Sequence, residues 1–200
     1  GLVRLHFHTR GALSNLHVEP QPALSLVGDD DVLLSVRAVG LNFRDVLNVL
    51  GEYPGDPGPP GGDAAGVVVE AASPPSPTFG LGHAPLASVA IAATPFLANK
   101  PSTLSFEQAC TLPVTWSTTH VAFERTGLRA GGSVVVQAAA GGVGLKAVEY
   151  AQWLPASTVG TAGRPHKHAQ LRAMGVKALC SSRDGAALTT GVTRHMAATR

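Results

Sequence analysis

The stretch that decides the fold runs from Ser133 to Val148 and reads SVVVQAAAGGVGLKAV. A β-branched apolar run passes through small residues and glycines into an amphipathic run, which predicts a buried strand, a tight turn and a helix start. Gly141 and Gly144 have no Cβ, so a diphosphate can approach the backbone and the helix can lie close to the strand. Free N–H groups at the helix start would face the anion. The spacing Ala138-x-x-Gly141-x-x-Gly144 therefore predicts a nucleotide-binding turn, although an alanine stands where the usual fingerprint has its first glycine.

The segments after this turn alternate between strand and helix patterns. We expect the first helix to end before Pro155, a strand at 157–161, a helix at 165–174 and a strand at 176–180. This β-α-β-α-β order is half of a doubly wound nucleotide-binding fold. The remaining strands would follow Arg200.

The part before residue 104 has a different pattern of short apolar runs separated by turns rich in glycine and proline. A short helix at 41–50 follows a strand, with Asn42 placed to cap it. The expected fold class is α/β, with a β-barrel-type module over 1–103 and a partial parallel Rossmann sheet over 104–200. The strands expected in the first module are 2–7, 32–39, 63–70 and 87–92, and the segment 11–19 is expected to form a turn and a further strand.

Composition excludes several classes of function. The formal net charge is only +2 and no basic block occurs, so nothing indicates nucleic-acid binding. The longest apolar runs are too short to span a bilayer. Cys110 and Cys180 form no Cys-x-x-Cys pair, which favours a reduced compartment such as the cytoplasm. The start at Gly1 has neither an initiator Met nor a signal-peptide pattern, so we expect a piece of a longer chain.

The segment 161–167, after the second strand of the nucleotide-binding half, predicts which cofactor binds. An acidic residue there would bind the ribose 2′-OH of NAD, whereas basic residues accept the 2′-phosphate of NADP. The segment contains Arg164 and Lys167 and no carboxylate. Cations are unfavourable at a helix N-terminus unless an anion is bound. The pattern therefore favours NADPH over NADH.

Five motifs carry a resemblance to a known family. The chain resembles a zinc-independent medium-chain dehydrogenase/reductase, and within that superfamily the enoyl reductase domain of polyketide and fatty acid synthases. The motifs are GLNFRDVL at 40–47, GEYPG at 51–55, ACTLPV at 109–114, the turn at 138–144 and SSRD at 181–184.

The resemblance implies a GroES-like substrate module and an NADPH-dependent oxidoreductase. The implied reaction transfers a hydride to Cβ of a trans-2-enoyl thioester carried by the phosphopantetheine of an acyl carrier protein, among neighbouring synthase domains. Tyr53 matches a loop tyrosine that donates a proton or gates the site, and simple loop packing is the alternative. Asn42 matches an asparagine beside the nicotinamide, a role that is compatible with capping its helix.

The residues expected to bind the cofactor come from the turn, from the segment after the second strand, and from positions that match the family. Thr118 matches a helix threonine that faces the nicotinamide carboxamide. Ser182 and Arg183 follow the third strand near the expected adenosine half, where an ordinary surface turn is the alternative. The full set is Thr118, Ala140, Gly141, Gly142, Val143, Gly144, Thr161, Arg164, Lys167, Ser182 and Arg183.

Departures from the family pattern leave alternatives open. The segment 62–66 lacks the His and Glu of zinc-dependent relatives, and the histidines show no ligand spacing, so no metal site is expected. The family's Gly-Asp-Arg-Val strand is expected to be missing between Glu70 and Leu86, and its later Lys and Asp would lie after Arg200. The alternatives are a free-standing NADPH quinone or alkenal reductase and a non-catalytic, degenerate reductase module.

Overall fold

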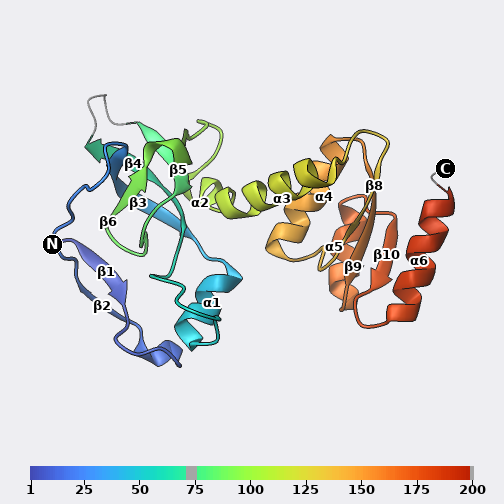
Figure 1. The fold of residues 1–200 in the computed structure, drawn as a ribbon, viewed down its shortest axis with the longest axis horizontal. Coiled ribbons are helices and arrows are strands. Elements are labelled where there is room, and N and C mark those ends of the chain that lie inside the picture. The colour runs from blue at the N-terminus through green and yellow to red at the C-terminus, as the bar shows by residue number, and fades with distance from the viewer. Residues whose placement is uncertain (71–75, 199–200) are drawn as a thin grey trace. The chain divides into compact units, whose positions relative to one another are not determined.

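The computed structural model describes residues 1–70 and 76–198. The chain folds into two compact units, Gly1–Val114 and Thr115–Arg200 (Figure 1). The boundary expected from the sequence, between residues 103 and 104, stays a prediction. Within the described residues, every helix is too short or too polar to cross a bilayer.

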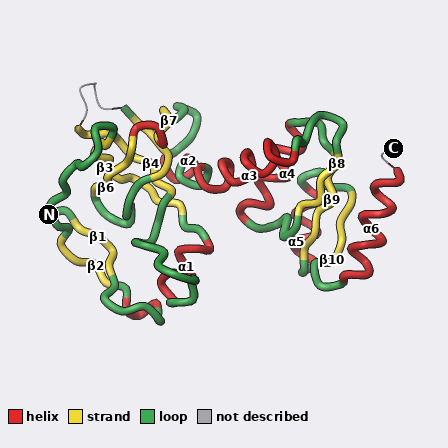
Figure 2. Tube along the Cα trace, in the orientation of Figure 1, coloured by secondary structure: helices red, strands yellow, loops and turns green. Residues whose placement is uncertain are grey.

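The first unit is an open antiparallel sheet with a separate two-stranded ribbon (Figure 2). The ribbon pairs β1 (Val3–His6) with β2 (His17–Pro20). The sheet contains β3 (Asp31–Gly40), β4 (Asp63–Glu70), β5 (Pro77–Leu81), β6 (Val89–Ala93) and β7 (Leu97–Asn99). Its order is β6-β3-β4-β5-β7, so the two strands that the sequence indicates most clearly, β3 and β4, lie inside it.

Two short helices complete the first unit, and local chemistry sets their ends. The helix α1 (Phe43–Leu50) begins after Asn42 in extended conformation and ends at Gly51, whose φ is 73°. The helix α2 (Phe106–Ala109) has the expected capping box, because Ser105 Oγ accepts from Gln108 N and Gln108 Oε1 accepts from Ser105 N. Single 3₁₀ turns lie at Leu13–Asn15 and Thr94–Phe96.

The strand β5 corrects the expectation that no strand lies between Glu70 and Leu86. It pairs with β4 along its whole length and with β7 over Thr78, Phe79 and Gly80. The sequence concealed it because the inward positions are the small residues Thr78 and Gly80 rather than large apolar ones. Pro77 is tolerated because it is the first residue of the strand. The earlier part of the expected loop, 71–75, lies outside the described residues.

The second unit is a parallel sheet with helices, and the expected alternation is confirmed. The strands β8 (Ser133–Val136), β9 (Ser157–Ala162) and β10 (Ala178–Ser181) pair in the order β10-β9-β8. The helices are α3 (Pro113–Thr126), α4 (Gly142–Trp153), α5 (Pro165–Ala173) and α6 (Gly185–Ala198). The sequence did not predict α6, where Gly191 lies directly against Cys180 of β10.

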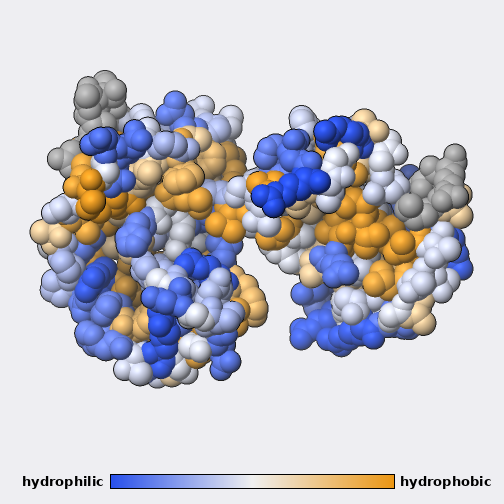
Figure 3. Space-filling model, in the orientation of Figure 1, coloured by the Kyte–Doolittle hydropathy of each residue, from blue (hydrophilic) through white to orange (hydrophobic). Residues whose placement is uncertain are grey.

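The core of the second unit is made by the inner faces of α4 and α5 against the sheet. Val148 and Leu171 are fully buried, and each stabilises the unit by roughly 1.5–3 kcal/mol. Apolar patches also remain on the surface of both units (Figure 3). Phe43 and Trp153 are among the large apolar side chains that are exposed.

Candidate functional site

The turn between β8 and α4 adopts a strained conformation that glycine would accommodate better. Ala138 has a φ of 48°, in the left-handed region that residues with a Cβ rarely adopt. The turn is held by three hydrogen bonds: Ala138 N donates to Thr161 Oγ1 at 3.1 Å, Ala139 N to Thr161 O at 2.9 Å, and Gly141 N to Ala138 O at 2.8 Å. The strand β9 therefore shapes the turn.

The approach of α4 to this turn leaves no room for a side chain at Gly144. A Cβ there would lie 2.4 Å from Ala138 O and 2.7 Å from Ala139 Cα, both backbone atoms that cannot rotate away. At Gly142 a Cβ would meet Thr115 Cγ2 at 3.7 Å, an ordinary contact. The first turn of α4 thus requires glycine at residue 144 but not at residue 142.

A hollow of about 130 Å³ lies where β9 ends, beside the turn. Parallel sheets of this kind bind their ligands at the carboxyl ends of the strands. The hollow brings together five residues that the sequence predicted as cofactor ligands, and adds three that it did not. The predicted ones are Ala140, Gly141, Thr161, Lys167 and Ser182, and the added ones are Ala138, Ala162 and Gly163.

The other predicted cofactor residues lie outside the lining of this hollow. Arg183 is adjacent to it, since a Cβ on Gly163 would lie 3.2 Å from Arg183 Nε. Arg164 is exposed at the N-cap of α5, and Thr118 is exposed on α3. Gly142, Val143 and Gly144 form the first turn of α4. Their contacts with a cofactor stay predictions.

In the first unit, Asn42 is held by a buried carboxylate that the sequence analysis did not single out. Asn42 Nδ2 donates to Asp63 Oδ2 at 3.0 Å, and Val114 N donates to Asp63 Oδ1 at 2.9 Å. Asp63 is 1% exposed. A carboxylate can only accept, so Asp63 fixes which way the Asn42 amide faces and leaves Asn42 Oδ1 as the acceptor at the start of α1. A single Asp at the start of a strand does not predict a hydrogen bond with Asn42, so the sequence alone could not have identified this pair.

Burial raises the pKa of the Asp63 carboxyl, and the charge of Asp45 adds to the increase, while the hydrogen bonds from Asn42 and Val114 oppose it. Burial also raises the pKa of the nearby Cys110 thiol. Both cysteines are free and buried, and Cys110 is therefore a poor nucleophile at neutral pH.

Asp63→Asn is expected to become more stable relative to the natural chain as pH rises from about 4 to 7. The raised pKa of Asp63 means that its contribution to stability is present below the unfolded pKa, near 4, and is lost as pH rises through the folded value. The amide introduced at residue 63 keeps both hydrogen bonds if the side-chain amide of Asn42 flips so that its oxygen faces it. Urea unfolding across this pH range measures the difference, with Asp56→Asn at an exposed site as the control. A difference that does not change with pH would contradict the prediction.

Asp45 ties α1 to the loop that precedes β4. It is buried, and it accepts from Asn42 N at 2.8 Å and from Gly61 N at 2.7 Å. Asn48, also buried, donates to Gly58 O at 3.0 Å. Within the NFRD stretch, Asp45 thus has a structural role. By anchoring α1, it places Asn42 at the start of that helix.

Tyr53 lies in the loop after α1 and is half-buried. The Arg44 guanidinium carbon lies 5.9 Å from the centre of the Tyr53 ring, and Arg44 donates to Pro57 O. Packing against Arg44 limits the positions of the ring. Its role as a proton donor stays a prediction.

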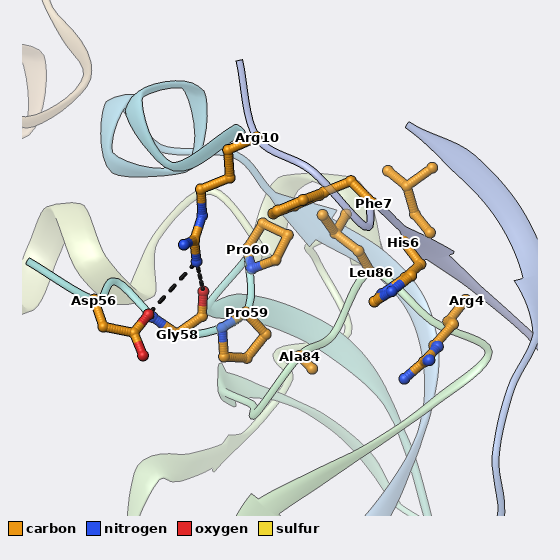
Figure 4. A pocket seen from close by; sticks show the side chains of 11 residues that line it. Arg4, His6, Phe7, Arg10, Asp56, Gly58, Pro59, Pro60, Ala84 and Leu86 are labelled. Carbon is orange, nitrogen blue, oxygen red and sulfur yellow. Dashed lines mark hydrogen bonds and ion pairs between the residues drawn. The ribbon is translucent and has the colours of Figure 1, made fainter. Parts of the chain in front are cut away.

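A larger pocket of about 380 Å³ opens in the first unit between the β1 segment and the proline-rich loop (Figure 4). Phe7, Pro59 and Pro60 give it apolar walls. At one end Arg10 donates to Asn48 Oδ1 at 2.9 Å, and it lies 3.5 Å from both Asp56 Oδ1 and Gly58 O. No sequence pattern indicates this pocket, because its walls come from segments far apart in the chain.

Comparison with known proteins finds polyketide synthases among the relatives of this chain. No protein-family model matches the chain. It is 40% identical over 184 residues to the erythronolide synthase EryA2 of Saccharopolyspora erythraea, covering 87% of this chain and 5% of that protein. It is 41% identical over 185 residues to the spectinabilin polyketide synthase system protein NorB of Streptomyces orinoci, covering 88% of this chain and 8% of that protein.

Two solved structures with the same fold are titled as reductases. The CurK enoyl reductase superposes with a TM-score of 0.83 at 31% identity, over 92% of this chain and 60% of that one. A quinone oxidoreductase from Thermus thermophilus, also solved with NADPH, superposes with a TM-score of 0.76 at 31% identity, over 90% of this chain and 59% of that one. The chain thus spans a small part of the synthases and about 60% of these reductases.

Proposed function

Because this chain is a homologue of polyketide synthases and has the fold of the enoyl reductases of the medium-chain dehydrogenase/reductase superfamily, we propose that it belongs to an NADPH-dependent enoyl reductase of a polyketide synthase. The reaction is reduction of the Cα=Cβ bond of an enoyl thioester. The observation that carries the proposal is the cationic hollow beside the glycine turn, in a chain that is homologous to polyketide synthases.

The residues around the hollow fit one part of a phosphorylated dinucleotide. Its volume of about 130 Å³ is below the roughly 300–1,000 Å³ of whole ligand pockets, so it suits one end of the cofactor. Its lining contains Lys167 and no carboxylate, and Arg183 lies beside it. Lysine and arginine both pair with phosphate, which favours a ribose 2′-phosphate over a free 2′-OH. The start of α4 at Gly141 would face the diphosphate.

Lys167→Glu is expected to weaken NADPH binding by roughly 10- to 100-fold and to change NADH binding little. The reason is that a charged hydrogen bond contributes about 1.5–3 kcal/mol, and only NADPH carries the 2′-phosphate. Fluorescence titration of the full-length protein with each cofactor gives the two Kd values. Lys177→Glu is the control, because this exposed lysine precedes β10, at the amino ends of the strands. Equal weakening of both cofactors by Lys167→Glu would refute the phosphate contact.

The first unit would supply groups to the substrate and nicotinamide. NADPH, when bound, supplies the hydride that reaches Cβ. Asn42, with its amide orientation fixed by Asp63, presents an acceptor oxygen that can position a carboxamide. Tyr53 carries a phenol that can donate a proton to Cα or to the thioester oxygen as negative charge develops there. Fixed donors and acceptors of this kind hold reacting groups at attack distance.

The deciding experiment measures NADPH oxidation by the full-length protein with crotonyl-pantetheine and with a quinone. Turnover of the thioester but not of the quinone supports the enoyl reductase. The opposite result supports a free-standing quinone reductase, which the quinone oxidoreductase among the structural neighbours favours as second candidate. Correct folding with no NADPH oxidation by either substrate would support the non-catalytic module.

The proposed partners follow from the same ancestry. An acyl carrier protein would bring the enoyl group on its phosphopantetheine arm, and neighbouring synthase domains would flank the reductase. A cytoplasmic location stays a prediction from the cysteine pattern.

A further inference from the structure

The ribbon of β1 and β2 gathers histidines on one face. The strands are antiparallel, with Arg4 opposite Glu19 and His6 opposite His17. Residues two apart on a strand point to the same face, so these four side chains share one face of the ribbon. His8 follows His6 by two residues and lies against it, with ring centroids 4.8 Å apart.

The spacing of the donor atoms on this face suits a single cation. One ligand atom from each of His6, His8 and Glu19 lies within 4.8 Å of the others. The His17 ring centroid is 5.0 Å from that of His8, and His17 Nε2 is 3.4 Å from Glu19 Oε2. His8 and His17 are exposed, so their rings can turn toward a shared ion at little cost.

Hydrogen bonds to neighbouring groups orient two of the donor residues. Arg4 holds the Glu19 carboxylate in place by donating to Oε1, with Nε at 2.8 Å and Nη2 at 2.6 Å. The other oxygen, Glu19 Oε2, is the one that lies near His17 Nε2. His17 Nδ1 lies 3.2 Å from Asn15 O, which can only accept, so Nδ1 is the donor in this contact and Nε2 is the ring nitrogen that faces the proposed site.

We propose that this face of the ribbon binds Zn²⁺, with His6, His8 and Glu19 as ligands and His17 as the fourth. Imidazole nitrogen with one carboxylate oxygen is a zinc donor set, whereas Mg²⁺ requires oxygen donors. Bond lengths of about 2.0–2.2 Å draw the four atoms closer together than they lie in the chain alone. Arg4 and the Asn15 carbonyl are the hydrogen-bond partners that orient Glu19 and His17, as such partners do in zinc sites.

The ion would hold the two strand segments of the ribbon together and would take no part in the reduction. A two-stranded ribbon is only marginally stable by itself, and here two ligands come from each strand segment. None of the four residues belongs to the predicted cofactor or catalytic set. Arg4 and His6 also line the larger pocket, at the end away from Arg10 (Figure 4). Bound zinc would therefore fix that end of the pocket.

The test is calorimetric titration of the full-length protein with ZnCl₂ at about pH 7.5, where histidine is mostly neutral. We expect one zinc ion per chain, no comparable binding of MgCl₂, and a melting temperature that rises with zinc concentration. His8→Ala should weaken binding by roughly 100-fold, because losing a ligand costs at least as much as losing a ligand's hydrogen-bond partner. Glu19→Gln keeps the side-chain shape but removes the charge, and it should also weaken zinc binding.

His83→Ala is the matched control, because His83 is exposed in the same unit and belongs to no ligand group among the described residues. It should bind zinc as the natural chain does. Unchanged affinity in both His8→Ala and Glu19→Gln would overturn the proposal. An equal loss in His83→Ala would overturn it too, since it would show binding by scattered surface histidines.

Discussion

Gly144→Ala is expected to abolish most dinucleotide binding and to destabilise the second unit. The new Cβ would lie 2.4 Å from Ala138 O and 2.7 Å from Ala139 Cα, so α4 must move away from the turn. Such overpacking costs about 1–3 kcal/mol, or a fall of roughly 3–10 °C in melting temperature. A displacement of about 1 Å at a binding turn can cost roughly 100-fold, so the Kd for NADPH should rise by that order.

The matched control is Gly142→Ala, two residues earlier in the same helical turn. Its Cβ would meet only Thr115 Cγ2, at 3.7 Å, and alanine favours the helix by up to about 1 kcal/mol over glycine. The melting temperature should therefore stay constant or rise, and NADPH binding should persist. Thermal melts and fluorescence titration on the full-length protein compare the two variants. Natural affinity and stability in Gly144→Ala would show that the diphosphate has been placed wrongly.

Asp45→Ala is expected to cost about 3–5 kcal/mol of unfolding free energy. The substitution leaves the N–H groups of Asn42 and Gly61 without their acceptor in a buried place, and each hydrogen bond to a charged group contributes about 1.5–3 kcal/mol. The loss outweighs the relief of repulsion with Asp63, because Asp45 is the last of the four influences on the Asp63 pKa. Urea unfolding of the full-length protein measures the loss.

Asp56→Ala provides the comparison within the neighbouring loop. The Asp56 side chain is 84% exposed, and its ion pair with Arg10 is long, at 3.5 Å. Exposed pairs contribute about 0–1 kcal/mol, so this variant should stay within about 1 kcal/mol of the natural chain. If both variants lost the same stability, the anchoring role of Asp45 would be disproved. With the enoyl reductase assay, Asp45→Ala should also lower turnover, because Asn42 loses its fixed position.

Periodicity predicted those elements whose large apolar residues repeat regularly. The strand β8, the glycine turn and α4 follow from a β-branched run, three glycines and an amphipathic run within sixteen residues. The sequence did not predict the strand β5, because Thr78 and Gly80 fill its inward positions and its pairing with β4 is what makes it a strand. The sequence did not predict the helix α6, because Gly191 sits in its middle and glycine disfavours a helix interior.

The sequence by itself determined the alternation of strands and helices, the glycine at residue 144 and the cationic segment after β9, because each depends on neighbours within a few residues. Only the tertiary structure decided that Asp63 holds Asn42, that Lys167 and Ser182 line one hollow beside the turn, and that histidines from two strands lie together on one ribbon face. These partnerships join residues that are well separated along the chain. Strand register and chain crossovers bring these residues together, and local periodicity determines neither of them.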